Sequence, residues 1–180
     1  MKKRKSGEKG FTLIEVIVTL VLVGITAALA GMWIVSVANG YIFAQTNAKT
    51  AQNGQLAMTR LVKELTAMKS VTTAGSTSIA FKKATSGSAS EDVTISLNGT
   101  LLQITDGSGT NTLTDSVSAF SVTYCTNPTG TAYCGGELAA NSCSADWSST
   151  TSRTIRIDLT LTGANNTNST FTQCVTPRNL

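Results

Sequence analysis

The sequence predicts an α+β fold in which a long N-terminal α-helix, membrane-embedded over its first half, packs on a small antiparallel β-sheet head. One observation is the apolar run at residues 11–38, where Glu15 is the only residue charged at neutral pH. Another is the change of composition near Val71, beyond which Ser, Thr, Gly and Asn alternate with short apolar runs. A long apolar helix followed by short strands and turns indicates this class.

The first predicted element is a membrane helix at residues 11–38. About 20 apolar residues span a bilayer, so this run is long enough. The basic cluster before it, which comprises Lys2, Lys3, Arg4, Lys5 and Lys9, is expected to stay in the cytoplasm. The bulk of the chain is therefore expected to face outward.

Two simpler interpretations of this segment remain open. A plain single-pass anchor explains the length of the run but leaves Glu15 unexplained. An ordinary secretory signal could be cut at Ala28-Leu29-Ala30, although its apolar core would exceed the usual length of about 7 to 15 residues and would contain Glu15.

Residues 39–70 continue the helix with an amphipathic pattern. They contain no proline, and Glu64 falls off the apolar stripe. The stripe residues recur at the three-four spacing of a helix and are Met58, Leu61, Val62, Leu65 and Met68. A helix continuous from about Phe11 to Ser70 would be about 90 Å long. We expect its second half to cover the head.

The globular head, residues 71–180, is predicted to consist of strands separated by turns. The strand candidates are residues 78–81, 93–97, 101–105, 117–124, 154–161 and 170–176. Asn98-Gly99, between the second and third candidates, is a strong signal for a tight hairpin. In the fifth candidate Ile155, Ile157, Leu159 and Leu161 fall on one side, which predicts a sheet whose apolar face the helical stripe covers.

Glu15 requires a partner. A carboxylate at the bilayer centre costs about 2.5 to 3.5 kcal/mol on insertion scales, and its apolar neighbours offer none. A cut between Gly10 and Phe11 would create an α-amino group, whose pKa of about 7.7 to 8.0 makes it a cation at neutral pH. The amine of a neighbouring subunit could then neutralise Glu15.

The basic leader, Gly10, the run Phe11-Thr12-Leu13-Ile14-Glu15 and the following apolar helix closely resemble the processing site of type IV pilins and type II secretion pseudopilins. The resemblance covers the first third of the chain and implies a type IV pilin-like fold. It implies that residues 1–10 are a prepilin leader, that prepilin peptidase cuts between Gly10 and Phe11 and that Phe11 is N-methylated. It also implies that Glu15 guides docking into a filament.

The same resemblance implies the partners and the location of the protein. The partners are other pilin or pseudopilin subunits, prepilin peptidase, an inner-membrane assembly platform and the membrane itself. The location is the bacterial inner membrane, as a single-pass protein with a cytoplasmic N-terminus, and then a periplasmic or cell-surface filament. Many major pilins carry a proline near the position of Met32, and its absence here favours a minor subunit, pilin or pseudopilin.

The four cysteines, Cys125, Cys134, Cys143 and Cys174, all lie in the outward-facing head, where disulfides persist. Three pairings are possible. Alternation along the last strand places Cys174 on the outer face of the sheet, opposite the apolar face. A loop that folds over this outer face could reach Cys174. We therefore expect Cys143 to bond Cys174 and Cys125 to bond Cys134. An all-cysteine zinc site is the rival interpretation, although the chain has no histidine and no Cys-x-x-Cys pair.

Charge and motif content indicate assembly rather than turnover. The net charge of +4 comes from the leader, with its five basic residues and one acidic residue, so residues 11–180 are close to neutral and no nucleic-acid partner is expected. Lys82, Lys83, Arg153 and Arg156 are expected to be solvated surface charges.

No histidine, nucleophile elbow or phosphate loop is present in the sequence, which predicts a protein that is not an enzyme and needs no cofactor or metal. The segment 106–111 has alternating oxygen ligands but lacks the closing acid of a calcium loop, and a turn is expected there. The alternative function is a membrane-tethered or filament-tip binding module for adhesion or DNA uptake. Such a module should show a concave pocket or a basic groove.

Overall fold

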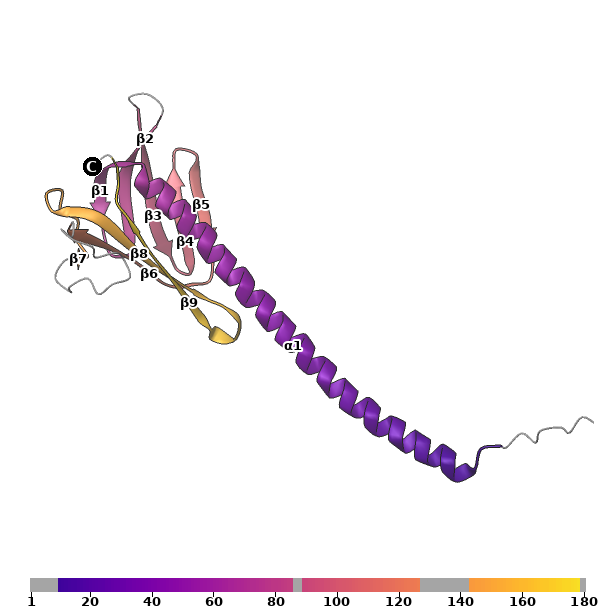
Figure 1. Cartoon of the computed structure of the whole chain (residues 1–180). Helices are drawn as coiled ribbons and strands as arrows, with labels where there is room; N and C mark the ends of the chain where they lie inside the picture. The colour runs from indigo at the N-terminus through magenta and orange to yellow at the C-terminus, as the bar shows by residue number, and fades with distance from the viewer. Residues whose placement is uncertain (1–9, 86–88, 127–142, 179–180) are drawn as a thin grey trace, which may run out of the picture. The chain divides into compact units, whose positions relative to one another are not determined.

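The computed structural model describes residues 10–85, 89–126 and 143–178. The chain forms two compact units, residues 1–44 and 45–180, and the long helix α1 (Leu13–Thr66) contributes to both. Figure 1 shows the order of the elements along the chain. The layout, a long N-terminal helix packed on antiparallel sheets, is the expected α+β class and matches a type IV pilin-like fold.

Two threonines in the apolar part of helix α1 form hydrogen bonds within the helix. The Thr19 hydroxyl donates to the Val16 carbonyl at 2.9 Å, and the Thr26 hydroxyl donates to the Leu22 carbonyl at 2.9 Å. These bonds leave no side-chain donor without a partner at Thr19 or Thr26, which suits a helix in an apolar medium.

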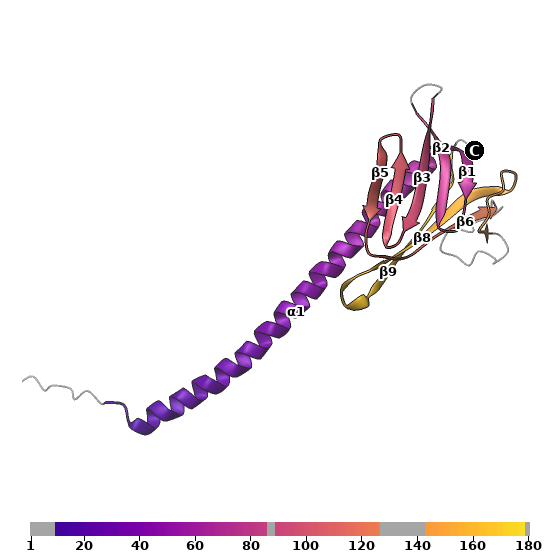
Figure 2. The ribbon, with the colours of Figure 1, turned by 180° about the vertical axis from the view of Figure 1, so that it is seen from behind.

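The head contains two antiparallel sheets. Sheet A is a meander in the order β1-β2-β3-β4-β5, and Figure 2 shows its strands side by side. Its strands are β1 (Met68–Ala74), β2 (Ser78–Ala84), β3 (Ser90–Asn98), β4 (Leu101–Asp106) and β5 (Gly109–Thr114). Sheet B has the order β7-β6-β8-β9. Its strands are β6 (Val117–Thr126), β7 (Cys143–Ser144), β8 (Ser152–Thr162) and β9 (Asn168–Val175). A short 3-10 turn, η1 (Ala164–Asn166), connects β8 and β9.

All six predicted strands are confirmed, and so is the hairpin between β3 and β4. Its two loop residues are Gly99 and Thr100, and Gly99 adopts φ +60°, which favours glycine. Three strands were not predicted, namely β1, β5 and β7. The helix ends at Thr66 rather than Ser70, and the head has two sheets where one was expected.

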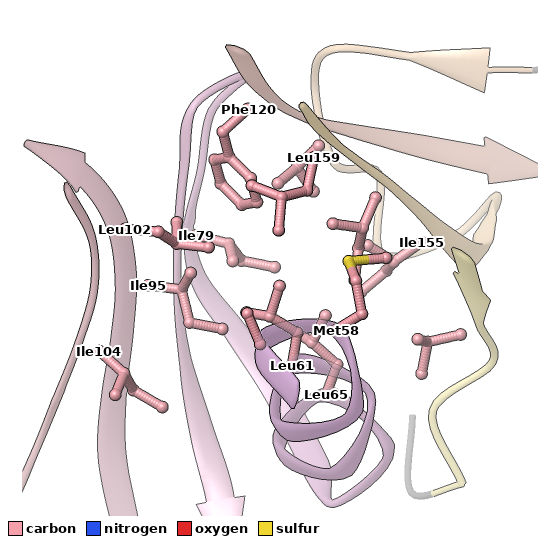
Figure 3. Close-up of a cluster of buried hydrophobic side chains, with 14 of the residues drawn as sticks. Met58, Leu61, Leu65, Ile79, Ile95, Leu102, Ile104, Phe120, Ile155 and Leu159 are labelled. Atoms are coloured by element: carbon pink, nitrogen blue, oxygen red, sulfur yellow. The ribbon is translucent and has the colours of Figure 1, made fainter. Parts of the chain in front are cut away.

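The core lies where the last turns of α1 meet both sheets, as Figure 3 shows. Leu61 and Leu65 of the helix are fully buried, as the stripe predicted. They pack in one cluster with side chains of sheet A, such as Ile79 and Ile95, and of sheet B, such as Phe120, Ile155 and Leu159. Met68 is also buried, although it belongs to β1 and not to the helix.

Two further contacts hold residues 45–66 of the helix on sheet B. Gly54 faces the Phe171 ring of β9 so closely that any side chain at position 54 would collide with it. Nearer the N-terminus of the helix, the Asn47 side-chain oxygen accepts hydrogen bonds from the Ala164 amide at 2.9 Å and the Thr167 hydroxyl at 3.1 Å. The turn between β8 and β9 is thereby fastened to the helix.

Candidate functional site

The N-terminal segment of α1 is the candidate processing and assembly site. Gly10, Phe11 and Thr12 precede the helix, and the amides of Glu15 and Val16 both donate to the Thr12 carbonyl, at 3.1 and 3.3 Å. Thr12 is therefore the residue that caps the helix, and Glu15 lies in its first turn. A carboxylate in this position is stabilised by the helix dipole, typically by about 0.3 to 1 kcal/mol.

The bond between Gly10 and Phe11 lies in accessible, non-helical backbone. Phe11 is 81% exposed. A Cβ atom built on Gly10 would meet no described atom within 4 Å. A side chain at position 10 is therefore tolerated by this chain itself, and any requirement for glycine there must come from another protein.

The surface of α1 after this segment is apolar and uncovered. Large side chains from Leu13 to Val37 are exposed, and the helix contains a window of mean hydropathy 2.5 of which 0% is buried. Exposed apolar area on this scale indicates a surface that another phase or another molecule covers. Glu15 interrupts it, and within the described ranges no cation or hydrogen-bond donor contacts its carboxylate.

Residues 5–31 match the family model for the prokaryotic N-terminal methylation motif. The match includes Gly10, Phe11 and Glu15, and it supports a type IV pilin-like protein that a prepilin peptidase processes. With the exposed apolar helix, it also supports anchoring in a membrane by a single N-terminal helix. Comparisons with curated proteins and with solved structures gave no match.

The cysteines pair differently from the prediction. Cys125, at the end of β6, bonds Cys143 of β7, with their Cα atoms 4.0 Å apart. Both predicted pairs, Cys143 with Cys174 and Cys125 with Cys134, are therefore wrong. Cys174 is also disulfide-bonded, whereas Cys134 lies outside the described residues. The prediction failed because β7 was not foreseen, and its pairing with β6 places Cys125 opposite Cys143.

A cluster of charged side chains around the buried Glu64 was also missed. Glu64 of α1 is only 3% exposed, and it contacts Arg60 and Lys83, each at 2.9 Å. Lys83 also pairs with Glu91 at 3.3 Å. The Glu91 carboxylate in turn accepts a hydrogen bond from the Gly107 amide at 3.0 Å.

The carboxylates in this cluster, Glu64 first, raise the pKa of Lys83 above its ordinary value. Helical spacing places Glu64 off the apolar stripe and the sequence predicts a solvated Lys83, but Glu64 is buried and the Lys83 side chain is only 19% exposed. The spacing of Arg60 and Glu64, one helical turn apart, was the available signal for part of the cluster.

One other candidate from the sequence, the segment 106–111, has a simple structure. The segment 106–111 forms the hairpin between β4 and β5, and the Asp106 carboxylate accepts a hydrogen bond from the Ser108 amide at 2.9 Å. Hydrogen bonds from Ser108 hold the pKa of Asp106 below its ordinary value. Among the described residues, no three metal-ligating side chains cluster.

A groove of about 680 Å³ runs between α1 and β9. Its lining combines polar and apolar side chains, and none of the described ones is charged: Gln55, Met58, Thr59, Val62, Phe171, Thr172 and Gln173. A lining without cations supplies no electrostatic attraction for nucleic-acid phosphates.

Proposed function

We propose that this protein is a structural subunit, and a minor one, of a bacterial type IV pilus-like filament or of a type II secretion pseudopilus. The observation that carries the proposal is the combination of the methylation motif at residues 5–31 with an uncovered apolar helix whose first turn holds Glu15. A filament of packed helices would cover the apolar surface and supply a partner for the carboxylate.

Maturation links these two features. Prepilin peptidase cuts between Gly10 and Phe11 and removes the leader, residues 1–10. The new α-amino group of Phe11 is N-methylated, which leaves it able to carry a positive charge. In the filament, the amine of one subunit then pairs with Glu15 of its neighbour and offsets the desolvation of both charges.

Before assembly the subunit is held in the inner membrane, with its N-terminus in the cytoplasm and its head outside. The basic cluster at the start of the chain supports this orientation. The platform protein of the assembly machinery and other pilin or pseudopilin subunits are the partners. A minor role is supported by the absence of proline near Met32, since many major pilins have one there.

The proposal is tested by the Gly10→Val variant, co-expressed with a prepilin peptidase. We expect the wild-type chain to lose ten residues and to begin with N-methylated Phe11, as read by intact-mass and peptide mass spectrometry. Gly10→Val should remain uncut, because the peptidase is expected to require glycine before the cut. Nothing in the described chain crowds position 10, so the defect would arise in recognition by the peptidase and not in the fold of the variant. Gly7→Val, a matched change inside the leader, should be processed normally.

A mature terminus at Gly31 would refute the proposal and favour the ordinary secretory signal. Equal processing of wild type and Gly10→Val would show that the glycine is not recognised.

A further inference from the structure

Helix α1 carries an aromatic face near the end of its apolar run. Trp33, Val37 and Tyr41 are four residues apart and therefore lie on one face. With Ile34 and Ala38 they line a shallow surface that is almost wholly apolar. Trp33 is 76% exposed and Tyr41 is 67% exposed, so no part of the described chain covers either ring.

The distance of this face from the start of the helix matches a membrane. Leu13, the first residue of the helix, and Trp33 are about 30 Å apart along a helix that rises about 1.5 Å per residue. The hydrocarbon core of a bilayer is about 30 Å thick. With Phe11 next to the basic cluster at the cytoplasmic surface, Trp33 reaches the opposite boundary of the hydrocarbon.

The residues after Trp33 are mixed before the chain turns polar. Ser36 and Asn39 interrupt the apolar run, Ile42 and Phe43 still belong to it, and Lys49 is the first charged residue beyond them. Tyr41 lies about 12 Å beyond Trp33 along the helix axis. Side chains on a helix lean toward its N-terminus, so the Tyr41 ring is directed back toward the bilayer and its hydroxyl can lie among the headgroups.

We propose that Trp33 and Tyr41 fix the depth of the helix at the outer membrane–water interface. Trp33 lies at the boundary of the hydrocarbon and Tyr41 in the headgroup layer, the level at which both residue types are enriched in membrane helices. The ligand of this face is the lipid surface. The inference rests on the proposed membrane anchoring, and it adds a register: Leu22, halfway between Phe11 and Trp33, lies at the bilayer centre.

This register differs from one in which the whole run of residues 11–38 is immersed. In that alternative Ala38 marks the outer boundary, and Trp33 lies about 7 Å inside the hydrocarbon. The two registers therefore place the Trp33 ring at measurably different depths.

Tryptophan fluorescence distinguishes them, because the chain has two tryptophans and Trp147 belongs to the head. In Trp147→Phe, Trp33 is the only fluorophore of its kind. The full chain is reconstituted in phosphatidylcholine–phosphatidylglycerol vesicles that contain phosphatidylcholine brominated near the headgroup or near the end of the acyl chain. We expect the shallow bromine to cause the larger loss of Trp33 fluorescence.

Two depth references complete the experiment, each made in the Trp33→Phe/Trp147→Phe background. Leu22→Trp should be quenched most by the deep bromine. Tyr41→Trp should be quenched little by either bromine and strongly by a spin label on the headgroup.

Deep quenching of both Trp33 and Leu22→Trp would overturn the register and leave membrane anchoring intact. If Leu22→Trp is not quenched at all, the helix does not insert, and both the register and the proposed anchoring are wrong. The Tyr41 assignment is overturned if Tyr41→Trp is quenched more by acyl-chain bromine than by the headgroup label.

Discussion

At the scale of single residues, two neighbouring lysines of β2 show how solvent exposure determines the contribution of an ion pair to the stability of the fold. The Lys83 side chain is 19% exposed and joins Glu64 on the helix to Glu91 on β3. The Lys82 side chain is 46% exposed and contacts the solvated Asp92 carboxylate, at 2.9 Å. Removing one member of a buried pair leaves an uncompensated charge, whereas an exposed pair contributes little.

We therefore expect Lys83→Met to lower the free energy of unfolding by about 2 kcal/mol. This is less than the loss expected on breaking a fully buried pair, because Lys83 and Glu91 are partly exposed to solvent. Lys82→Met, the matched control, should change it by no more than about 0.5 kcal/mol. Urea unfolding of the full chain in detergent, followed by near-ultraviolet circular dichroism, measures both. Similar losses in the two variants would show that the cluster does not hold the helix on the sheet.

The sequence identified the apolar contacts of this region and missed its charges for a physical reason. Helical spacing of Leu61 and Leu65 reports the face that is buried, and both are buried. The same spacing places Glu64 beside that face, where a carboxylate is normally solvated. Its burial depends on Lys83, which reaches it from a strand far along the chain, and no local pattern contains that information.

At the scale of elements, Tyr124 joins the two sheets. It lies on β6 of sheet B, is fully buried and meets Trp147 edge to face with ring centroids 5.6 Å apart. Its hydroxyl donates to the carbonyl of Gly75, between β1 and β2 of sheet A, at 3.3 Å. Burial raises the pKa of Tyr124 from 10.0 to about 12.

This shift makes the stability of the head sensitive to alkali. Because the folded pKa is the higher one, the contribution of Tyr124 is fully present below about pH 10 and is lost as the pH rises toward about 12. We expect Tyr124→Phe to lose less stability than wild type between about pH 8 and about pH 11, while starting about 1 kcal/mol lower without the hydrogen bond. Urea midpoints at the two pH values provide the comparison.

The control for this prediction is Tyr41→Phe, which alters an exposed tyrosine of the apolar helix and should keep the alkaline loss of wild type. If Tyr124→Phe lost as much stability as wild type between the two pH values, the sensitivity to alkali would come from other groups.

The elements that the sequence missed are those with little apolar patterning of their own. Strand β5 (Gly109–Thr114) is mostly exposed and has one large apolar residue, Leu113. Strand β7 has two residues, and its place opposite β6 includes a disulfide. Strand β1 begins at Met68, which also continues the helical stripe, so helix and strand patterns overlap there. By contrast, alternation in β8 is strict, and the burial of Ile155, Ile157, Leu159 and Leu161 confirms it.

At the scale of the whole molecule, a change at Glu15 distinguishes the proposed filament subunit from a plain membrane anchor. In the proposed filament, Glu15→Leu would leave the amine of the neighbouring subunit without its partner, and such a charge costs several kcal/mol. We expect cleavage to persist, because Gly10 and Phe11 are unchanged, and incorporation into filaments to fall. Shearing cells and comparing mature protein in the filament and membrane fractions measures this.

Thr19→Leu is the matched control for Glu15→Leu. It also makes the helix more apolar, but the Thr19 hydroxyl donates to a carbonyl within the helix, so no charge loses its partner. It should assemble as wild type does. Equal incorporation of Glu15→Leu and wild type would mean that Glu15 does not guide assembly.

The strand orders of the two sheets have a consequence for how the head folds. Sheet A pairs each strand with its successor, so each pairing closes only a short loop. Sheet B requires β6 to pair with β8 across residues 127–151, and the entropy lost in closing a loop grows with its length. The Cys125–Cys143 bond ties residue 143 of this connection back to β6 and shortens the loop that remains. Oxidation of this pair and completion of sheet B therefore favour each other, which couples the folding of the head to the redox conditions in which it folds.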